Sequence, residues 1–371
     1  MNKKILVVGG SFDNYGGRKS SLIEKITNEI LKINADTTVY NGGCFKALKE
    51  MILPSVGRYD IVFWWANIPN TEEKARNVKE INPKVILISS KRNDNGKYLF
   101  SELINRALEQ KSNLVVEFAK IEDKKFNMRV FDPLGTVWYD GTDIQGMVKN
   151  LMCRAKKLTK FMRVPSVADT VNAFPEIPNE ERFFAFARNC SDIFHNLINP
   201  DKNVMRFLGN MSFRCQNGFP SFRGENGLIF VSKRNVDKRE INKDSFVPCY
   251  LDENGTVRYF GENKPSVDTP IQLRLYKLHP EMNYMIHAHC YFNYKQVLTT
   301  DYPVPCGALE EVDEIENAIK NSEYNGNGFI AVNLKGHGCI LMANRVERLL
   351  GLMKFKDSFF VSRPMPESIE P

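Results

Sequence analysis

Short apolar runs alternate with amphipathic stretches through the first 160 residues of the chain. The runs "ILVVGG", "DIVFWWA" and "KVILISS" each have the length of one buried strand, and segments such as "SLIEKITNEILKI" carry apolar residues at helical spacing. Continuous apolar strands that alternate with amphipathic helices are typical of a parallel sheet covered on both faces. The pattern predicts a doubly wound, flavodoxin-like or Rossmann-like α/β domain over residues 1–165.

The pattern changes beyond the segment "MRVPSVADT", which we interpret as a junction between domains. A helical region, "NEERFFAFARNCSDIFHNLI", precedes short strands and turns, and then come a helix, a histidine-bearing strand and a last helix–strand–helix segment. This order predicts a second domain over residues 166–371 with an α/β/α arrangement. The length of 371 residues agrees with two domains, because one hydrophobic core rarely serves so long a chain.

Composition narrows the class of protein. The chain is 43% hydrophobic and 26% charged, values of a globular protein that argue against disorder. No apolar run approaches the length of a membrane span, and "MNKKILVVGG" predicts a first strand rather than a signal peptide. The cysteines are scattered without a CxxC pair, which favours a reduced, cytoplasmic protein. The net charge of +7 is spread along the chain and suits either ordinary surface charge or a small anionic metabolite as ligand, and we expect neither a nucleic acid partner nor a membrane.

Two of the five histidines stand one residue apart in the apolar stretch "MNYMIHAHC". In a strand, residues i and i+2 point to the same face, so His287 and His289 can reach one ion. Neutral imidazole is a good ligand for zinc and similar metals. The pair is also compatible with a strand rim whose histidines bond to water and backbone.

A third histidine favours the metal. The stretch "FIAVNLKGHGCILMA" predicts a second apolar strand, interrupted where Gly336 and Gly338 leave His337 uncovered. Three histidines from two strands, with one coordination position open, are what a catalytic metal site needs. The remaining two, His195 and His279, fall in helix patterns and are predicted to be surface or core residues.

Five motifs in order, from about Arg206 onward, carry a resemblance to a known family. They are "GNMSFR", "GLIFVSKRN", "VPCYLDENGTVRYFGENKPSVDTP", "LHPEMNYMIHAHC" and "LKGHGCILM". In this order they resemble the class II aldolase/adducin family, which includes L-fuculose-phosphate aldolase and L-ribulose-5-phosphate 4-epimerase. Nothing comparable covers the first domain.

The resemblance implies a divalent metal, most usually zinc, held by His287, His289 and His337. The family's acidic residue falls on Asp268. In the aldolase branch this position is a glutamate that acts as acid/base, and in the epimerase branch it is an aspartate followed by Thr-Pro. The triplet Asp268-Thr269-Pro270 is therefore epimerase-like. Asp268 also suits the N-cap of the helix that follows, so both roles stay open.

The resemblance further implies a phosphate site of backbone N–H groups and small hydroxyls at three turns. These positions fall on Gly209, Asn210, Ser232 and Ser266. Lys233 stands where the family has a glycine, and Val267 replaces a second serine. A cation at Lys233 would meet a phosphate or carboxylate directly.

The resulting hypothesis is a metal-dependent sugar-phosphate aldolase or epimerase of carbohydrate metabolism that acts through a zinc-stabilised enediolate. The alternative is a non-catalytic, adducin-like binding or sensor module. The histidines favour the enzyme, whereas Val267 and the lack of a tyrosine after Tyr324 favour the alternative, because related enzymes take a proton-handling tyrosine from a neighbouring subunit. The resemblance also implies a homo-oligomer, a tetramer. An acidic cluster that follows the histidine strand is interpreted as a solvated helix start, with a second acid/base as the other possibility: Glu310, Glu311 and Asp313.

A ligand of the first domain stays open. The turn "GGSFDNYGGRKSSL" between strand and helix could cradle a phosphate or be a purely structural turn, and Arg18 interrupts the Gly-Lys of a P-loop. The second strand, "TTVYNGG", lacks an acidic ribose ligand. Asn67, Lys91 and Arg92 lie near the ends of predicted parallel strands, where ligands of open α/β sheets bind.

Overall fold

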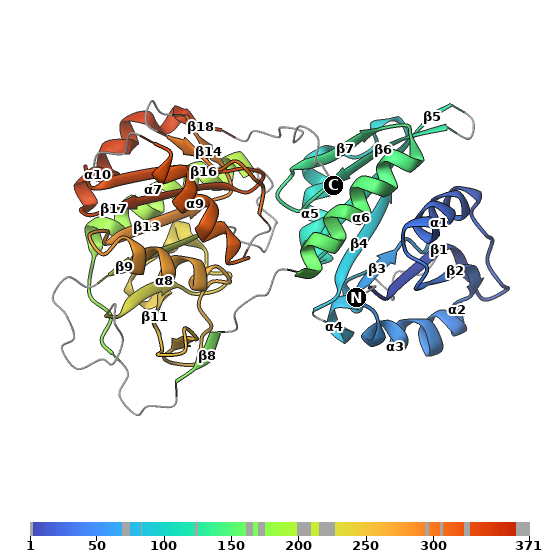
Figure 1. Cartoon of the computed structure of the whole chain (residues 1–371), viewed down its shortest axis with the longest axis horizontal. Coiled ribbons are helices and arrows are strands. Elements are labelled where there is room, and N and C mark those ends of the chain that lie inside the picture. Colours follow the sequence, from blue (N-terminus) through green and yellow to red (C-terminus); the bar gives the residue numbers. More distant parts are fainter. Residues whose placement is uncertain are drawn as a thin grey trace. The chain divides into compact units, whose positions relative to one another are not determined.

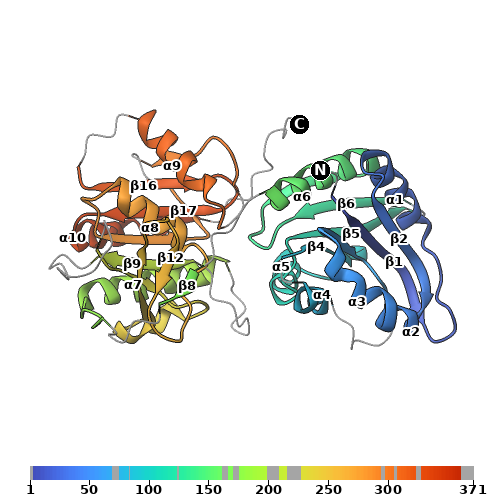
Figure 2. The same cartoon turned by 60° about the horizontal axis from the view of Figure 1, so that its bottom comes forward.

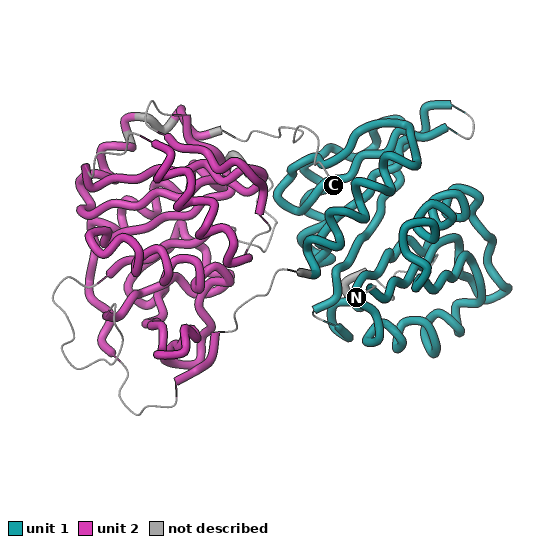
Figure 3. Tube along the Cα trace, viewed as in Figure 1, with its two compact units in different colours: residues 1–160, 363–371 teal, residues 161–362 magenta. Residues whose placement is uncertain are grey.

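The computed structural model divides into two compact units, residues 1–160 with 363–371 and residues 161–362 (Figure 3). Of the expected junction "MRVPSVADT", only Ser166–Asp169 is described. The described residues are 3–68, 75–82, 84–122, 125–160, 166–169, 175–198, 209–214, 227–293, 297–304, 307–322 and 327–360.

The first unit is built on a seven-stranded sheet in the order β2-β1-β3-β4-β5-β6-β7 (Figure 1). The first five strands pair in parallel, and the last two join antiparallel. The strands are β1 (Ile5–Asp13), β2 (Thr37–Cys44), β3 (Ile61–Trp64), β4 (Ile86–Arg92), β5 (Leu114–Glu122), β6 (Lys125–Phe131) and β7 (Val137–Gly141).

Helices cover both faces of this sheet. Ile5 and Val7 of β1 share a core with Ile26 of α1 and Leu151 of α6, whereas Leu6 faces a second core on the other side. The doubly wound α/β prediction is therefore confirmed, but the antiparallel strands β6 and β7 were not predicted. The helices are α1 (Ser21–Ile33), α2 (Phe45–Ala47), which runs into a π-helical turn (Leu48–Ile52), α3 (Leu53–Ser55), α4 (Ala75–Ile81), α5 (Phe100–Glu109) and α6 (Ile144–Lys160).

The second unit is built on a nine-stranded sheet in the order β15-β16-β17-β13-β9-β10-β11-β12-β8. The β15–β16 and β12–β8 pairs are parallel, and the other neighbours are antiparallel. Its strands are β8 (Ser166–Ala168), β9 (Asn210–Arg214), β10 (Ile229–Ser232), β11 (Phe246–Leu251), β12 (Val257–Tyr259), β13 (Tyr284–Ala288), β15 (Leu298–Thr299), β16 (Phe329–Leu334) and β17 (Gly338–Ala343), with β14 (Tyr291–Phe292) and β18 (Phe359–Phe360) paired apart.

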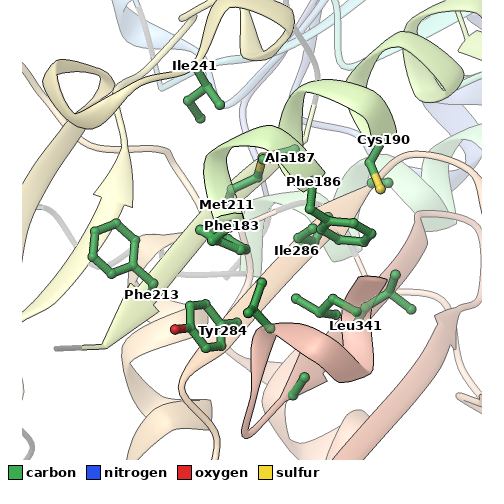
Figure 4. Packing of buried hydrophobic residues seen from close by; sticks show 14 of the residues in the cluster. Phe183, Phe186, Ala187, Cys190, Met211, Phe213, Ile241, Tyr284, Ile286 and Leu341 are labelled. Atoms are coloured by element: carbon green, nitrogen blue, oxygen red, sulfur yellow. The ribbon is translucent and has the colours of Figure 1, made fainter. Parts of the chain in front are cut away.

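Alternate residues of these strands serve two different cores, as the pleat of a strand requires. Ile286 of β13 packs with Phe183 of α7 (Glu181–Ile198), and Figure 4 shows this cluster. Met285 joins the opposite core, to which α8 (Thr269–Leu278) and α9 (Glu310–Lys320) contribute. The predicted α/β/α layering is confirmed and can be followed in Figures 1 and 2, with α10 (Val346–Leu350) beside α7. His287 follows Met285 by two residues and therefore faces the layer of α8 and α9.

One strand prediction is wrong. The stretch "FIAVNLKGHGCILMA" forms two antiparallel strands, β16 and β17, rather than one interrupted strand. Gly336 and Gly338 have φ values of 72° and 144°, which favour glycine and let the chain reverse. A Cβ on Gly338 would lie 2.1 Å from the carbonyl oxygen of Ala288, so the reversal sets His337 close to the end of β13.

Candidate metal centre

His287, His289 and His337 come together at one end of the central strands of the second unit. All three side chains are buried, and one ligand atom from each lies within 4.8 Å of the others. The ring centroids are 4.9 Å apart for His287–His289, 4.6 Å for His287–His337 and 5.1 Å for His289–His337. The three histidines singled out in the sequence thus form one cluster, two from β13 and its end and one from the β16–β17 turn.

The hydrogen bonds of these rings leave nitrogen atoms available for an ion. The Nδ1–H of His287 donates to the carbonyl oxygen of Cys339 at 3.0 Å, which fixes the tautomer and leaves a lone pair on Nε2. Within the part of the chain that the structure describes, Nε2 of His287 and both ring nitrogens of His289 have no hydrogen-bond partner. An unpaired buried polar group costs about 1–3 kcal/mol. A divalent cation would satisfy these atoms, so the residues fit a metal that prefers nitrogen ligands.

The protonation of the cluster also suits a metal. Burial lowers the pKa of His287 to about 4, helped by the neighbouring His337 and opposed by Asp268. Burial lowers the pKa of His289 well below its ordinary value, and His287 and His337 act in the same direction. These two imidazoles are therefore neutral near pH 7, and a cation does not have to displace a proton from them.

Glu311 lies behind His337. Its Oε1 is 2.5 Å from Nδ1 of His337, both side chains are buried, and burial raises the pKa of Glu311. A carboxylate on the far nitrogen orients a ligating histidine and increases its basicity. Our interpretation of the acidic cluster as a solvated helix start is correct for the exposed Glu310 and Asp313 but wrong for Glu311. The missed signal is its spacing, four residues before the buried Ile315 on the inner face of α9.

Asp268 begins α8 but does not act as its side-chain cap. Its backbone occupies the N-cap position, yet the side chain makes no capping hydrogen bond. Instead, Oδ2 of Asp268 accepts a hydrogen bond of 2.8 Å from Nδ2 of Asn210. Oδ1 of Asn210 in turn accepts from Nε2 of Gln272, and all three residues are buried. Because the charge of Asp268 acts on His287, this carboxylate belongs to the surroundings of the histidines.

A buried lysine, Lys238, also lies in this neighbourhood and was not predicted. It starts a 3-10 turn (Lys238–Glu240), is 6% exposed, and donates from Nζ to the carbonyl oxygen of Val236 at 3.2 Å. Burial lowers the pKa of Lys238 to about 8, opposed by the charges of Asp237 and Asp268. Its positive charge contributes to the low pKa of His287 and His289. The sequence "VDKREI" gives no signal of this burial, because it has the composition of a solvated turn.

The residues expected to bind phosphate have several of their polar groups engaged within the fold. The N–H of Lys233 donates to Ser245 at 2.8 Å, and the N–H of Ser266 donates to the carbonyl of Ser232 at 3.1 Å. The hydroxyl of Ser232 accepts from the N–H of Met211 at 3.1 Å. These two backbone N–H groups are therefore already engaged, and an anion would depend on side chains.

Gly209 also has a positive φ, 79°, and a Cβ there would lie 2.5 Å from the carbonyl oxygen of His287. Glycine at this position therefore permits the close approach of the backbone to the histidine strand.

The strand ends of the first unit are held by their own contacts. The backbone of Asn67 bonds to Gly10 and Phe12 at 2.8 and 2.9 Å. Nζ of Lys91 lies 4.3 Å from the centroid of the Tyr98 ring, and the Nε of Arg92 bonds to Asp94 at 2.5 Å.

Donors of the glycine-rich turn are likewise used inside the unit. The N–H of Ser11 donates to Arg18 at 2.9 Å, that of Arg18 to the Ser11 hydroxyl at 2.6 Å, and that of Gly17 to Gly43 at 2.9 Å. These bonds support the structural interpretation of the turn rather than a phosphate cradle.

Residues 194–355 match the family model described as Class II Aldolase and Adducin N-terminal domain. This region is therefore similar to class II aldolase and adducin N-terminal domains. The match covers the histidine cluster, Asp268 and Glu311, so the resemblance found in the sequence is confirmed. Among the described residues of the whole chain, no helix is long and apolar enough to cross a membrane.

Several solved structures resemble parts of this chain. An L-fuculose 1-phosphate aldolase is 17% identical, covering 49% of this chain and 85% of its own, with a TM-score of 0.33. The L-fuculose-1-phosphate aldolase from Thermus thermophilus is 16% identical, with 48% and 92% covered and a TM-score of 0.29. The DNA/pantothenate metabolism flavoprotein from Streptococcus pneumoniae is 13% identical, with 42% and 98% covered and a TM-score of 0.34. No curated protein matches the chain.

Proposed function

We propose that the class II aldolase-type domain is a divalent-metal enzyme that acts on a sugar phosphate, as an aldehyde-lyase or an epimerase. The observation that carries this proposal is the cluster of three buried imidazoles, in which one ring nitrogen from each lies within 4.8 Å of the others. Zinc suits the donor set best, because three neutral nitrogen ligands leave the fourth tetrahedral position open for a substrate oxygen.

The residues of the chain have distinct roles in this proposal. When bound, the cation would polarise a substrate carbonyl and stabilise the charge of an enediolate. Asp268, fixed by Asn210, is the carboxylate that accepts the substrate proton. The carbonyl of Cys339 and the carboxylate of Glu311 orient His287 and His337.

An anionic substrate is supported by the charges close to the predicted phosphate turns. Lys233 is half-buried and Arg234 is exposed, and both directly follow Ser232. Cationic side chains bind phosphate strongly as charge-assisted donors. In this proposal the two cationic side chains bind the phosphate in place of the backbone N–H groups of Lys233 and Ser266. Gly209, Ser232 and the side chain of Ser266 belong to the same phosphate-binding turns.

Metal analysis of the purified protein tests this proposal. We expect about one equivalent of zinc per chain, loss of that metal in His287→Ala, and retention in His195→Ala, whose ring lies on α7 outside the cluster. Unmutated protein that binds no zinc, manganese or cobalt, even after dialysis against each ion, would contradict the proposal.

The second candidate is an adducin-like binding module, favoured by the engaged N–H groups of Lys233 and Ser266. Exchange of carbon-bound substrate protons in heavy water distinguishes the two candidates. If the protein is an enzyme, its metal-loaded form exchanges a carbon-bound proton of at least one ketose phosphate in a panel. A binding module binds the ketose phosphate without exchange.

We also propose that the protein is a homo-oligomer, on the resemblance to the family. Light scattering of the metal-loaded protein measures the size of the oligomer.

A further inference from the structure

A buried hydrogen-bonded chain runs from α8 through β9 back to the start of α8. Nε2 of Gln272 donates to Oδ1 of Asn210, and Nδ2 of Asn210 donates to Oδ2 of Asp268 at 2.8 Å. Gln272 and Asn210 are each 1% exposed and Asp268 is 7% exposed. Gln272 lies four residues after Asp268, one helical turn away, so the chain closes on the first turn of α8. Asn210 pairs with His287 across β9 and β13, so the hydrogen-bonded chain of side chains lies next to the histidine strand.

The direction of the hydrogen bonds in this chain follows from the carboxylate. An ionised aspartate only accepts, so the amide nitrogen of Asn210 has to face Asp268 and its oxygen has to face Gln272. Gln272 must then present its nitrogen to Asn210. In the described part of the chain its Oε1 has no hydrogen-bond partner although it is buried. Reversing the Gln272 amide would place two oxygens against each other, so the arrangement tolerates one unpaired acceptor in order to keep a donor on Asn210.

Charged and titratable groups from three further elements face the same carboxylate. Lys238 of the 3-10 turn, His287 of β13 and Glu311 of α9 all interact electrostatically with Asp268. The carboxylate is therefore within electrostatic range of a cation, an imidazole and a second acid. A fixed hydrogen bond from Asn210 defines the orientation of the group among these charges.

We propose that Asn210 and Gln272 are positioning residues for Asp268, and that the carboxamide of Asn210 serves this carboxylate rather than the anionic group of the substrate. This hydrogen-bonded chain holds the Asp268 carboxyl in one orientation, so that the carboxylate meets the substrate proton in a fixed geometry. The proposal rests on the proposed function of the domain, and it assigns to Asn210 a different role from the phosphate contact that the family resemblance implies.

The first test separates kcat from KM. In Asn210→Ala, measured as exchange of substrate protons in heavy water by the metal-loaded protein, we expect kcat to fall by at least 30-fold and KM to change by less than threefold. A phosphate ligand would behave in the opposite way, because loss of substrate binding raises KM. A raised KM with kcat preserved would overturn the proposal.

The second test uses two replacements of Gln272 that are close to it in size. An ionised glutamate only accepts, so Gln272→Glu reverses the Asn210 amide and sets its oxygen against Asp268, whereas a protonated glutamate donates as glutamine does. We expect exchange by Gln272→Glu to be within threefold of the unmutated protein at pH 5 and at least 30-fold lower at pH 8. Gln272→Met removes the donor without adding a charge, and its smaller loss should not depend on pH. Identical pH profiles for the two variants would contradict the proposal.

A third measurement needs neither metal nor substrate. The carbon-13 shift of the Asp268 carboxyl, identified by its loss in Asp268→Asn, is measured at pH 7 in the metal-free protein. We expect this chemical shift to change in Asn210→Ala and in Gln272→Glu, because each variant removes the hydrogen bond from the Asn210 amide to the carboxylate. An unchanged chemical shift in both variants would refute the positioning role, whatever the activity. Absence of metal and of exchange in the unmutated protein would instead refute the proposed function, and this measurement would still decide the role of the hydrogen-bonded chain.

Discussion

The glycine-rich turn of the first unit and the histidine cluster of the second differ in how their polar groups are satisfied. In the first unit, several donors of the glycine-rich stretch at the end of β1 are engaged, and the carboxamide of Asn41 bonds to both the N–H and the carbonyl of Ser20 at 2.9 and 3.0 Å. In the second unit, Nε2 of His287 and both ring nitrogens of His289 are buried without a hydrogen-bond partner among the described residues. A turn rich in glycine and serine is therefore a weaker sign of a site than buried polar atoms that the fold leaves unpaired.

The buried charged residues of the two units also differ in the groups that surround them. Asp132 of the first unit accepts from Nε1 of Trp138 at 3.0 Å and from the N–H of Thr136 at 3.1 Å, and the guanidinium of Arg154 lies 3.6 Å from the Trp138 ring centroid. This arrangement holds one loop and one helix together. In the second unit, the charge of Lys238 instead acts on two histidines and on Asp268. Buried polar and charged groups thus connect a loop and a helix in the first unit, whereas in the second they gather around a candidate ion site.

The largest expected effect comes from placing a methyl group on a close backbone contact in each unit. Gly338→Ala brings a Cβ to 2.1 Å from the carbonyl oxygen of Ala288 at a φ of 144°, and Gly17→Ala brings one to 2.0 Å from that of Ser11. We expect each to lower the free energy of unfolding by at least about 3 kcal/mol. Only Gly338→Ala should also abolish metal binding, because it displaces the end of β13 from the β16–β17 turn. Thermal unfolding and metal analysis measure the two effects.

Two further glycines serve as controls for these variants. A Cβ on Gly57 of the first unit or Gly351 of the second meets nothing within 4 Å. Gly57→Ala and Gly351→Ala should leave both Tm and metal content unchanged. Loss of metal in Gly17→Ala would show that the first unit supports the histidine cluster. The two units would then no longer differ in their contribution to metal binding.

Glu311→Gln tests the carboxylate behind His337. The amide can still accept from Nδ1 of His337, but it lacks the charge that increases the basicity of the ring. We expect the affinity for zinc to fall by about 10–100-fold, measured by competition with a chromogenic chelator. Glu310→Gln, at the exposed neighbouring position, should keep the affinity. Equal affinities for both variants would show that Glu311 only fills space.

Local periodicity explains what the sequence could predict. Apolar runs and helical spacing depend on neighbours along the chain, so the parallel sheet of the first unit and the layers of the second were correctly predicted. His287 and His289 were paired because a strand places residues i and i+2 on one face. The β6–β7 extension was missed, because "KFNMRVF" and "VWYDG" become strands only through pairing with β5 and with each other.

The parts of the site that were missed depend on contacts between distant segments. Glu311 meets His337 across 26 residues, and Gln272 meets Asn210 across 62 residues. Nothing in the composition around Lys238 reveals that its turn is covered. A sequence places a side chain on a face of its own element, but the burial of a charge is decided by the element that packs against it.

Lys238→Met tests the buried cation. Its pKa of about 8 in the folded protein lies below the ordinary value of 10.5, and this difference corresponds to about 3 kcal/mol of destabilisation below pH 8. The lost bond to Val236 would offset about 1 kcal/mol, so we expect the variant to be more stable by about 2 kcal/mol at pH 7. Between pH 8 and 10.5 the unfolded chain holds more protons than the folded one, so the stability of the unmutated protein rises with pH in that window, and this rise should be absent from the variant.

Denaturant unfolding at pH 7, 8.5 and 10 measures this difference, with the exposed Lys243→Met as the control expected to match the unmutated protein. The affinity for zinc should also increase in Lys238→Met, because a positive charge that acts on two of the ligands has been removed. A variant that loses stability and zinc affinity together would show that Lys238 is a structural element of the site rather than a cation held at its edge.

The smallest expected effect tests the turn of the first unit. Ser11→Ala removes the hydroxyl that accepts from the N–H of Arg18 at 2.6 Å, so we expect stability to fall by about 1 kcal/mol while the metal content stays unchanged. Because the donors of this turn are engaged within the unit, inorganic phosphate should not raise the Tm of either protein by specific binding. If phosphate protects the unmutated chain and fails to protect Ser11→Ala, the turn binds anions. The contrast between engaged donors in the first unit and unpaired ring nitrogens in the second would then be wrong, since both units would have a ligand site at the ends of their strands.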